Sequence, residues 1–197
     1  MEKLAQNHYP LHELIKQRWS PLAFNSRPVE PEKIGSLLEA ARWAASCYND
    51  QPWFFIIATQ DQPKEFEKLL NCIVAANQKW AKDAPILIIS VARLSFKHNN
   101  KPNRHALHDV GLAMGNLTLQ AQSLGLFLHQ MGGFDQEKTK ETYHIPENYE
   151  PVAAIAIGYP GNVNQLESDL QERELSPRNR KPLAEFVFQD DWGNSYF

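Results

Sequence analysis

The chain has 197 residues, of which 43% are apolar and 22% charged, and its formal net charge is −3. This length suits one domain with a sizeable core, and the scattered charges lack the pattern typical of nucleic-acid or membrane-surface binders. The first residues lack an apolar signal segment, and no stretch approaches membrane-spanning length. Cys47 and Cys72 are too few for a disulfide framework and lack metal-site spacing. We therefore expect a cytoplasmic protein with reduced thiols and with neither nucleic-acid nor membrane partners.

The N-terminal half predicts two helices followed by two strands. Residues 10–19 form a short helix, and residues 30–45 form a longer one that begins with Pro31 near its first position. The runs 53–59 (WFFIIAT) and 85–92 (PILIISVA) are continuous and apolar. Such runs are typical of strands that are buried on both faces.

The C-terminal half is dominated by a predicted helix over residues 104–124. Its apolar residues recur at steps of three and four, and they are Leu107, Val110, Met114, Leu117, Ala121 and Leu124. Gly111, Ala113 and Gly115 keep the backbone accessible, so the helix should lie deep in a core or against a partner helix. Residues 126–131 and 152–159 are predicted strands, and 183–188 is a candidate for a last one, after a polar excursion over 161–181. This interleaving favours an α+β or α/β fold with helices on both faces of a sheet.

The most informative polar segment runs from Ser46 to Trp53 and reads S-C-Y-N-D-Q-P-W. It follows a predicted helix and leads into a buried strand, so its polar groups should lie at an edge of the sheet. Asn and Gln each offer a donor and an acceptor, which suits the edge of a heterocycle. The alternative is an ordinary helix-to-strand turn with an Asn cap and a proline.

Two further segments favour the ligand-binding interpretation. Arg18 and Ser20, at the end of the short helix, can grip a phosphate through a guanidinium fork and a hydroxyl donor. Gly132 and Gly133 follow an apolar strand and let the backbone approach a flat ligand. Alone, the Arg18–Ser20 segment would most often be surface decoration, and the glycine pair could equally be an ordinary strand-end turn.

Together, the order and spacing of these segments resemble the FMN-binding nitroreductase family, over about residues 14–192. The closest form is a short-chain branch that carries R-W-S-P, here 18–21, and H-Q-M-G-G-F-D, here 129–135. Residues 109–121 resemble the family's central helix, and 145–161 its penultimate strand and exit turn. The resemblance implies one domain over residues 1–197 with an α+β three-layer sandwich, in which helices flank a mainly antiparallel sheet. It also implies a homodimer joined through the long helix, with two FMN sites at the interface.

Carried over residue by residue, the resemblance implies a phosphate clamp. Arg18, Trp19 and Ser20 fall where the family contacts the FMN phosphate and ribityl chain. Arg178 and Arg180 match a basic pair that holds the phosphate from the C-terminal side. Without the other motifs, that pair would be read as solvent-exposed charge.

The resemblance also assigns residues to the flavin ring. Ser46, Cys47 and Asn49 fall where the second subunit closes over the flavin, and Gln51 should help to hold that loop. At the ring itself three residues carry over: Asn77 toward the pyrimidine side, and Gly132 and Gly133 with main-chain amides toward N5 and O4.

Two positions depart from the family pattern. Leu22 and Trp80 stand where relatives place cations near flavin N1 and O2. Without those cations the reduced flavin loses electrostatic support, so its reduction potential should be low. Arg104 or Lys82 could substitute for them.

The implied activity is transfer of reducing equivalents from NADH or NADPH to a planar acceptor, a nitroaromatic, quinone or flavin, by a ping-pong mechanism. The flavin carries this chemistry, and no side chain is assigned as catalytic. One alternative is an FMN-binding dimer that stores or degrades flavin without nicotinamide turnover. Another is a relative that has lost flavin and acts through its dimer surface.

Metal and hydrolase chemistry are disfavoured. His105 and His108 could share one helix face beside Asp109, but no third cluster of ligands is visible, so we expect a surface or interface role. Neither Cys47 nor any serine has a neighbouring histidine and acid in a triad-like pattern.

Overall fold

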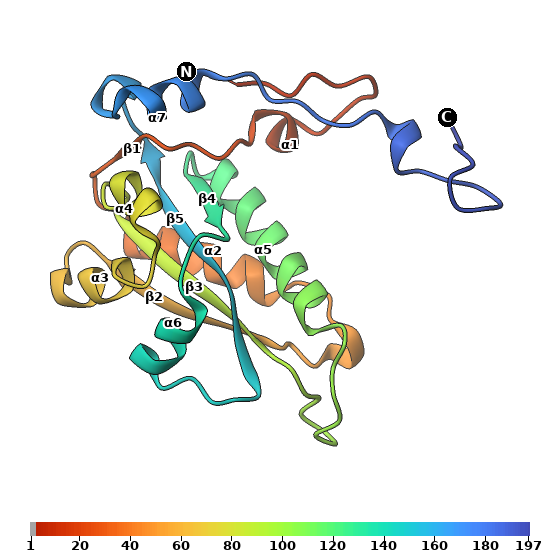
Figure 1. The fold of residues 1–197 in the computed structure, drawn as a ribbon, viewed down its shortest axis with the longest axis horizontal. Coiled ribbons are helices and arrows are strands. Elements are labelled where there is room, and N and C mark those ends of the chain that lie inside the picture. Colours follow the sequence, from red (N-terminus) through yellow and green to blue (C-terminus); the bar gives the residue numbers. More distant parts are fainter. Residues whose placement is uncertain (1–2) are drawn as a thin grey trace.

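A five-stranded antiparallel sheet forms the centre of the molecule (Figure 1). The structure is a computed structural model that describes residues 3–197. Strand β3 (Ile86–Arg93) pairs with β2 (Trp53–Thr59) on one side and with the long β5 (Tyr149–Pro160) on the other. The short β1 (Phe24–Asn25) and β4 (Phe127–Met131) pair with consecutive stretches of β5. The predicted α+β sandwich with a mainly antiparallel sheet is confirmed.

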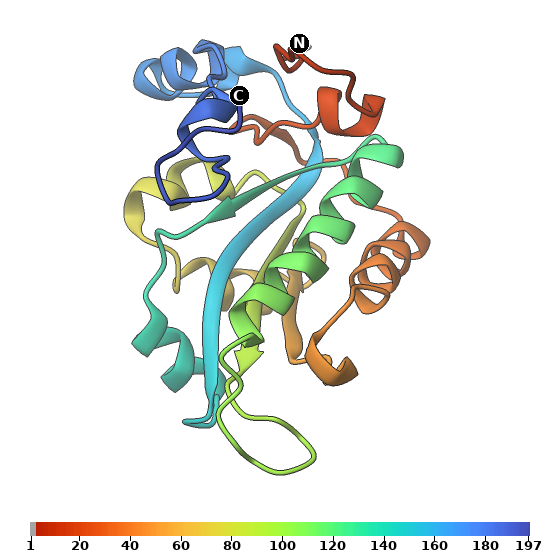
Figure 2. The same ribbon diagram turned by 90° about the vertical axis from the view of Figure 1, so that its right-hand side faces the viewer.

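Helices cover both faces of this sheet (Figure 2). Because side chains alternate along a strand, Ile86 and Ile88 of β3 enter one core, whereas Leu87 and Ile89 enter the other. The first of these cores is closed by α2 (Pro31–Arg42) and α5 (Ala106–Ser123). The second is closed by residues of α3 (Pro63–Leu70), α4 (Ala75–Ala81) and α7 (Ser168–Leu175).

The long helix α5 has two different faces. Val110, Met114 and Leu117 are buried against the sheet, as their spacing predicts. Leu107 was expected on the same face, but it is 46% exposed, as is Leu112 at 41%. The outer face therefore combines exposed leucines with the exposed small residues of this helix. Its predicted contact with a partner helix remains a prediction.

The remaining helices are short. They are α1 (Glu13–Gln17), α6 (Gln136–Tyr143) and the 3-10 turns η1 (Cys47–Asn49), η2 (Val163–Gln165) and η3 (Leu183–Glu185). The sequence predicted α1, but not α3, α4 or α6, and α7 lies inside the stretch expected to be a polar excursion. Local signals start some of them: Pro63 stands at the first position of α3, and the Asp135 carboxylate caps α6 by accepting from Lys138 N at 2.9 Å.

Two strand predictions are wrong in part. Strand β2 was expected to be covered on both faces, but it is an edge strand that pairs only with β3, so Phe54 and Ile57 are 43% and 38% exposed. The last strand predicted over 183–188 is instead η3 and a single bridge between Phe188 and Ser195. No neighbouring strand is available there, since the C-terminal segment runs away from the sheet (Figure 1). None of the helices between residues 3 and 197 combines the length and apolar composition needed to cross a bilayer.

Candidate functional site

Three predicted phosphate ligands meet at the end of α1. Arg18 caps this helix in an extended conformation, and its Nη1 donates to Ser20 Oγ at 3.2 Å. The Arg178 guanidinium donates to the Arg18 carbonyl and, through Nη2, to the Lys16 carbonyl at 3.2 Å. The fold thus joins residues that are 160 positions apart in the chain. We call Arg18, Ser20, Arg178 and Arg180 the clamp.

The clamp carries positive charge that the protein itself does not neutralise. Burial first, and then the charges of Arg178 and Arg180, lower the pKa of Arg18 below its ordinary value. Burial and Arg180 lower the pKa of Arg178 in the same direction. Within residues 3–197 no carboxylate forms an ion pair with any of the three arginines, and the buried Arg178 Nε has no partner there. Such a group of cations is suited to an anion with several oxygens.

Trp19 fixes the clamp to the sheet. Its ring is 5% exposed and lies edge-on to Phe127 of β4, with ring centroids 5.9 Å apart. The Lys3 ammonium lies 5.1 Å from the centre of the same ring. The Trp19 side chain therefore packs against the sheet, and its contact with a ligand remains a prediction.

Two further side chains hold the clamp segment, and the sequence did not single them out. His129 of β4 donates from Nδ1 to the Pro21 carbonyl at 2.8 Å, and Glu174 of α7 accepts from Leu22 N at 2.7 Å. Burial lowers the pKa of His129, so its ring is neutral near pH 7. Burial also raises the pKa of Glu174. His129 belongs to the H-Q-M-G-G segment, but nothing in the sequence pattern separates it from an ordinary strand residue. Likewise, nothing separates Glu174 from the other acidic residues of α7.

The glycine turn after β4 brings together three other predicted residues. The Gly133 carbonyl accepts from Asn77 Nδ2 at 3.2 Å and from Val74 N at 3.1 Å. A Cβ on Gly133 would lie 2.5 Å from Asn77 Nδ2, so a larger residue here would displace the Asn77 side chain from its bond to the turn. Gly132 is exposed, and a Cβ built there meets nothing within 4 Å. The turn is thus held from α4 and leaves open backbone at Gly132.

The segment Ser46–Gln51, which we call the site loop, is strained. Tyr48, Asn49 and Gln51 have φ angles of 54°, 53° and 50°. This left-handed conformation costs a non-glycine residue about 1–2 kcal/mol. Such strain persists only where surrounding contacts enforce it, and it is concentrated at functional sites.

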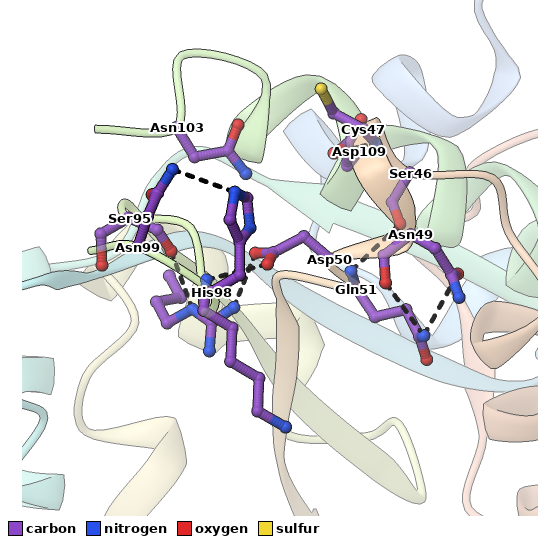
Figure 3. A network of polar contacts seen from close by, with 12 residues as sticks. Ser46, Cys47, Asn49, Asp50, Gln51, Ser95, His98, Asn99, Asn103 and Asp109 are labelled. Atoms are coloured by element: carbon purple, nitrogen blue, oxygen red, sulfur yellow. Dashed lines mark hydrogen bonds and ion pairs between the residues drawn. The ribbon is translucent and has the colours of Figure 1, made fainter. Parts of the chain in front are cut away.

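Polar contacts enforce this conformation (Figure 3). The Ser46 hydroxyl accepts from Gln51 N at 3.0 Å, and Gln51 Nε2 donates to Asn49 O and Oδ1 at 3.2 Å each. The buried carboxylate of Asp109, on α5, accepts from Cys47 N at 3.0 Å. All four predicted residues of the loop, Ser46, Cys47, Asn49 and Gln51, therefore take part in one network.

Asp50 fastens the other side of the site loop. Its carboxylate accepts from Arg93 Nη2 at 2.6 Å and from Lys97 N at 2.8 Å. Burial alone would raise the pKa of Asp50, but these bonds and the Arg93 charge outweigh it, so the pKa lies below its ordinary value. The loop is consequently bound both to α5 and to the segment that follows β3.

Within one chain, the site loop and the clamp lie at opposite ends of α5 (Figure 1). Cys47 contacts Asp109 near the beginning of this helix, whereas Leu14 of α1 lies beside Leu119 and Ser123 near its end. Ten helical residues, from 109 to 119, span about 15 Å. The structure thus assembles the clamp and the glycine turn separately from the site loop.

Residues 15–159 match the Nitroreductase family. The chain belongs to the nitroreductase family. The match includes the site loop, Asn77 and the glycine turn, but it ends before Arg178 and Arg180, whose assignment therefore depends on the geometry of the clamp.

Individual nitroreductase-family proteins and related sequences extend this likeness. A 15.4 kDa protein of Mycolicibacterium smegmatis is 36% identical over 134 residues, which cover 68% of this chain and 89% of that protein. A putative NADH dehydrogenase/NAD(P)H nitroreductase of Methanothermobacter thermautotrophicus is 32% identical over 152 residues, covering 75% and 76% of the two chains. A crystal structure of an oxidoreductase containing FMN superimposes with a TM-score of 0.91 at 35% identity, covering 96% of each chain.

At the two positions where this nitroreductase-family chain departs from the pattern, the side chains are buried. Leu22 and Trp80 are 4% and 1% exposed and belong to one core cluster. The neutral His129 ring lies 4.6 Å from the Trp80 ring, between centroids. Arg104 and Lys82, the expected substitutes, are exposed. Among the residues that the structure describes, the Phe24 ring also stacks on Trp80, with centroids 6.2 Å apart, so the two rings packed against Trp80 are both uncharged.

His105 and His108 were weighed as metal ligands from the sequence. No cluster of three or more His, Cys, Asp or Glu side chains in the described part of the chain is arranged to hold a metal ion. The exposed His108 lies 3.3 Å from Asp109, whose carboxylate supports the site loop.

Proposed function

We propose that this protein is an FMN-dependent oxidoreductase that transfers reducing equivalents from NADH or NADPH to a planar acceptor, a nitroaromatic, quinone or flavin. The observation that carries the proposal is the clamp, whose three guanidiniums form no ion pair with a carboxylate among residues 3–197, together with the open glycine turn. The likeness to an FMN-containing oxidoreductase over nearly the whole chain supports the same cofactor.

The residues of the site fit FMN. A phosphate monoester carries about −1.5 to −2 charges near neutral pH, which would offset the mutual repulsion of Arg18, Arg178 and Arg180. The partnerless Arg178 Nε is a buried donor of the kind that a phosphate oxygen can satisfy. The open backbone at Gly132 suits a flat ring that approaches main-chain amides.

The spacing of the site favours a mononucleotide. His129 holds the carbonyl of Pro21, the residue that follows Ser20 of the clamp. His129 itself lies three residues before Gly132 in the chain. Three residues of extended strand measure about 10 Å. This gap accommodates the five-carbon ribityl chain between the ring and the phosphate, and a single phosphate clamp suits a mononucleotide.

The chain would bind and orient while the cofactor does the redox chemistry. When bound, FMN supplies hydride transfer between the nicotinamide and the acceptor, which occupy the same cleft in turn. The clamp anchors the phosphate, and the rigid glycine turn holds main-chain groups against the ring. Asn77 fixes that turn through the Gly133 carbonyl and keeps its own Oδ1 as an acceptor.

We further propose that a second copy of the chain completes each site. The site loop is rigid, strained and partly exposed, but it is about a helix length away from the clamp of its own chain. A homodimer packed through the outer face of α5 would bring the site loop of one subunit over the ring held by the other. The monomer alone would then lack a complete site.

The deciding experiment is the absorbance spectrum of the purified protein, followed by chromatography of any flavin released on denaturation. We expect a yellow protein that releases FMN and not FAD, and that oxidises NADH or NADPH at steady state. Absence of flavin, together with no uptake from excess FMN, would contradict the proposal. Bound FMN without nicotinamide oxidation would instead favour flavin storage.

A further inference from the structure

A basic loop follows β3 and lies against the site loop (Figure 3). We call residues 94–105 the basic loop. It contains Lys97, Lys101 and Arg104 as well as two histidines, and no acidic residue occurs anywhere between Asp83 and Asp109. In a chain whose formal net charge is −3, this is a strong local excess of positive charge.

Three cations of this loop form no ion pair within residues 3–197. Arg93, at its base, is already neutralised by Asp50, and both side chains are largely buried. Lys97, Lys101 and Arg104 are exposed, and none forms an ion pair with a carboxylate among residues 3–197. Among the residues that the structure describes, no carboxylate therefore competes with a negatively charged ligand for these three side chains.

The basic loop is also fixed in shape. Phe96 N donates to the Lys101 carbonyl at 2.9 Å, and Asn100 N donates to the Phe96 carbonyl at 2.9 Å. Lys97 N is held by Asp50 of the site loop at 2.8 Å. Because these bonds close the turn that carries Lys97 and Lys101, little backbone ordering entropy remains to be lost when a ligand binds, and the entropy cost comes mainly from the two lysine side chains.

An exposed aromatic ring stands beside these cations. Tyr48 of the site loop is 82% exposed and has a left-handed backbone. Phe96 holds its ring edge-on, with centroids 5.8 Å apart and planes at 84°, and His98 lies 6.0 Å away. The ring is thus supported from the side and leaves surface to which a flat base can stack.

We propose that Tyr48 and the basic loop bind the adenosine 2′-phosphate end of NADPH, so that this oxidoreductase uses NADPH in preference to NADH. The adenine stacks on Tyr48, and Lys97 and Lys101 contact the 2′-phosphate, the group that distinguishes the two nicotinamides. The proposal rests on the proposed function, because the nicotinamide must reach a flavin beneath the site loop.

Equilibrium binding to the flavin-loaded dimer tests the inference without turnover. We expect adenosine 2′,5′-bisphosphate to bind about tenfold more tightly than AMP in calorimetry at low salt, a difference of about 1.4 kcal/mol. The gap should narrow as salt screens exposed charges. Equal affinities would overturn the proposal.

Substitutions separate the phosphate contact from stacking. The double variant Lys97→Gln/Lys101→Gln should weaken the bisphosphate about tenfold without the same effect on AMP. It should also lower the ratio of kcat/KM for NADPH to that for NADH by a similar factor. Tyr48→Leu should weaken the binding of both nucleotides by about tenfold, because stacking of the adenine does not depend on the 2′-phosphate.

The control is Lys64→Gln, which removes one exposed lysine of α3. It should change neither the affinity for the bisphosphate relative to AMP nor the kcat/KM for NADPH relative to NADH. If Lys64→Gln lowers these two ratios as much as the double variant does, the loss comes from the change in the overall charge of the protein, and the inference fails. It also fails if the lysine variants alter only the KM of the acceptor. A protein that oxidises NADH and NADPH equally well would overturn the inference while leaving the proposed function intact, whereas a protein without flavin would overturn the latter.

Discussion

Replacing Arg178 by Gln should lower the stability of the FMN-bound protein far more than the stability of the apo-protein, because it weakens FMN binding. The substitution removes a guanidinium that donates to the carbonyls of Arg18 and Lys16. In the apo-protein the loss of these bonds is offset, because the charge that lowers the pKa of Arg18 also disappears. With FMN bound, that compensation is absent and a charge-assisted contact to the phosphate is lost.

The size of the effect follows from the clamp. A hydrogen bond to a charged group contributes about 1.5–3 kcal/mol, so a loss of about 2 kcal/mol raises the Kd of FMN about 30-fold. At an FMN concentration of about 100 times the wild-type Kd, binding stabilises the wild type by about 2.7 kcal/mol and the variant by about 0.9 kcal/mol. For a chain of this size, 1 kcal/mol shifts the Tm by about 2–4 °C. The FMN-induced shift should therefore fall from about 5–11 °C to about 2–4 °C.

Thermal melts with and without FMN measure both quantities in one experiment. Arg42→Lys is the control, since this arginine lies on the exposed side of α2 in a pair with Glu39, and its FMN-induced shift should equal that of the wild type. An unchanged shift in Arg178→Gln, or a loss of apo-protein stability as large as the loss of holo-protein stability, would refute a role for the clamp in binding phosphate.

Four other outcomes are expected. Asp50→Ala should cost about 3–5 kcal/mol in urea unfolding because it leaves Arg93 buried and unpaired, and Asp50→Ala/Arg93→Leu should recover most of that; equal losses would disprove the argument. Stability should fall as pH drops below about 6.5, because burial lowers the pKa of His129 and the unfolded histidine takes up a proton first. His129→Gln should flatten this part of the curve, and an unflattened curve would assign it to another group. Light scattering should give twice the chain mass of 22.6 kDa at every workable concentration, whereas a monomer that binds FMN tightly would contradict the shared site. The flavin potential should lie below that of relatives with a cation in place of Leu22, because a charge about 4 Å away interacts by about 4 kcal/mol at a dielectric of 20; equal potentials would mean that another cation substitutes.

The sequence predicts the central elements well because their apolar residues form a long run or a sustained helical period. The run 53–59 coincides with β2, the predicted 85–92 with β3 at 86–93, and the predicted 104–124 with α5 at 106–123. Helices of seven or eight residues, such as α3 and α4, were not predicted from the sequence. Each buries only two residues, which is too few for a recognisable helical period. The run 183–188 has the composition of a strand, but composition does not reveal that no neighbouring strand is available to pair with it.

The same division applies to the candidate site. Arg18, Ser20 and the glycine turn were predicted because their residue types have specific uses, a guanidinium fork and a hydroxyl for phosphate and a glycine for close approach. Arg178 and Arg180 were assigned only through the family resemblance. The left-handed site loop was not predicted, because contacts from Asp109 and Arg93, both distant in the sequence, impose its conformation. Glu174 was missed for the same reason, since its partner Leu22 lies 152 positions away.

The pairing of strands on β5 limits how this site can change. The clamp leads into β1 and the glycine turn follows β4, and both strands are registered on β5, at Pro160 and at Ala154–Gly158. Inserting one residue into β4 would turn every later side chain to the opposite face of the sheet. Inserting two residues keeps each later side chain on its own face of the sheet, but it adds about 7 Å to the gap between the clamp and the glycine turn. The length of the cofactor can thus change only in coarse steps, so gradual drift of side chains can alter its affinity and potential but not its size.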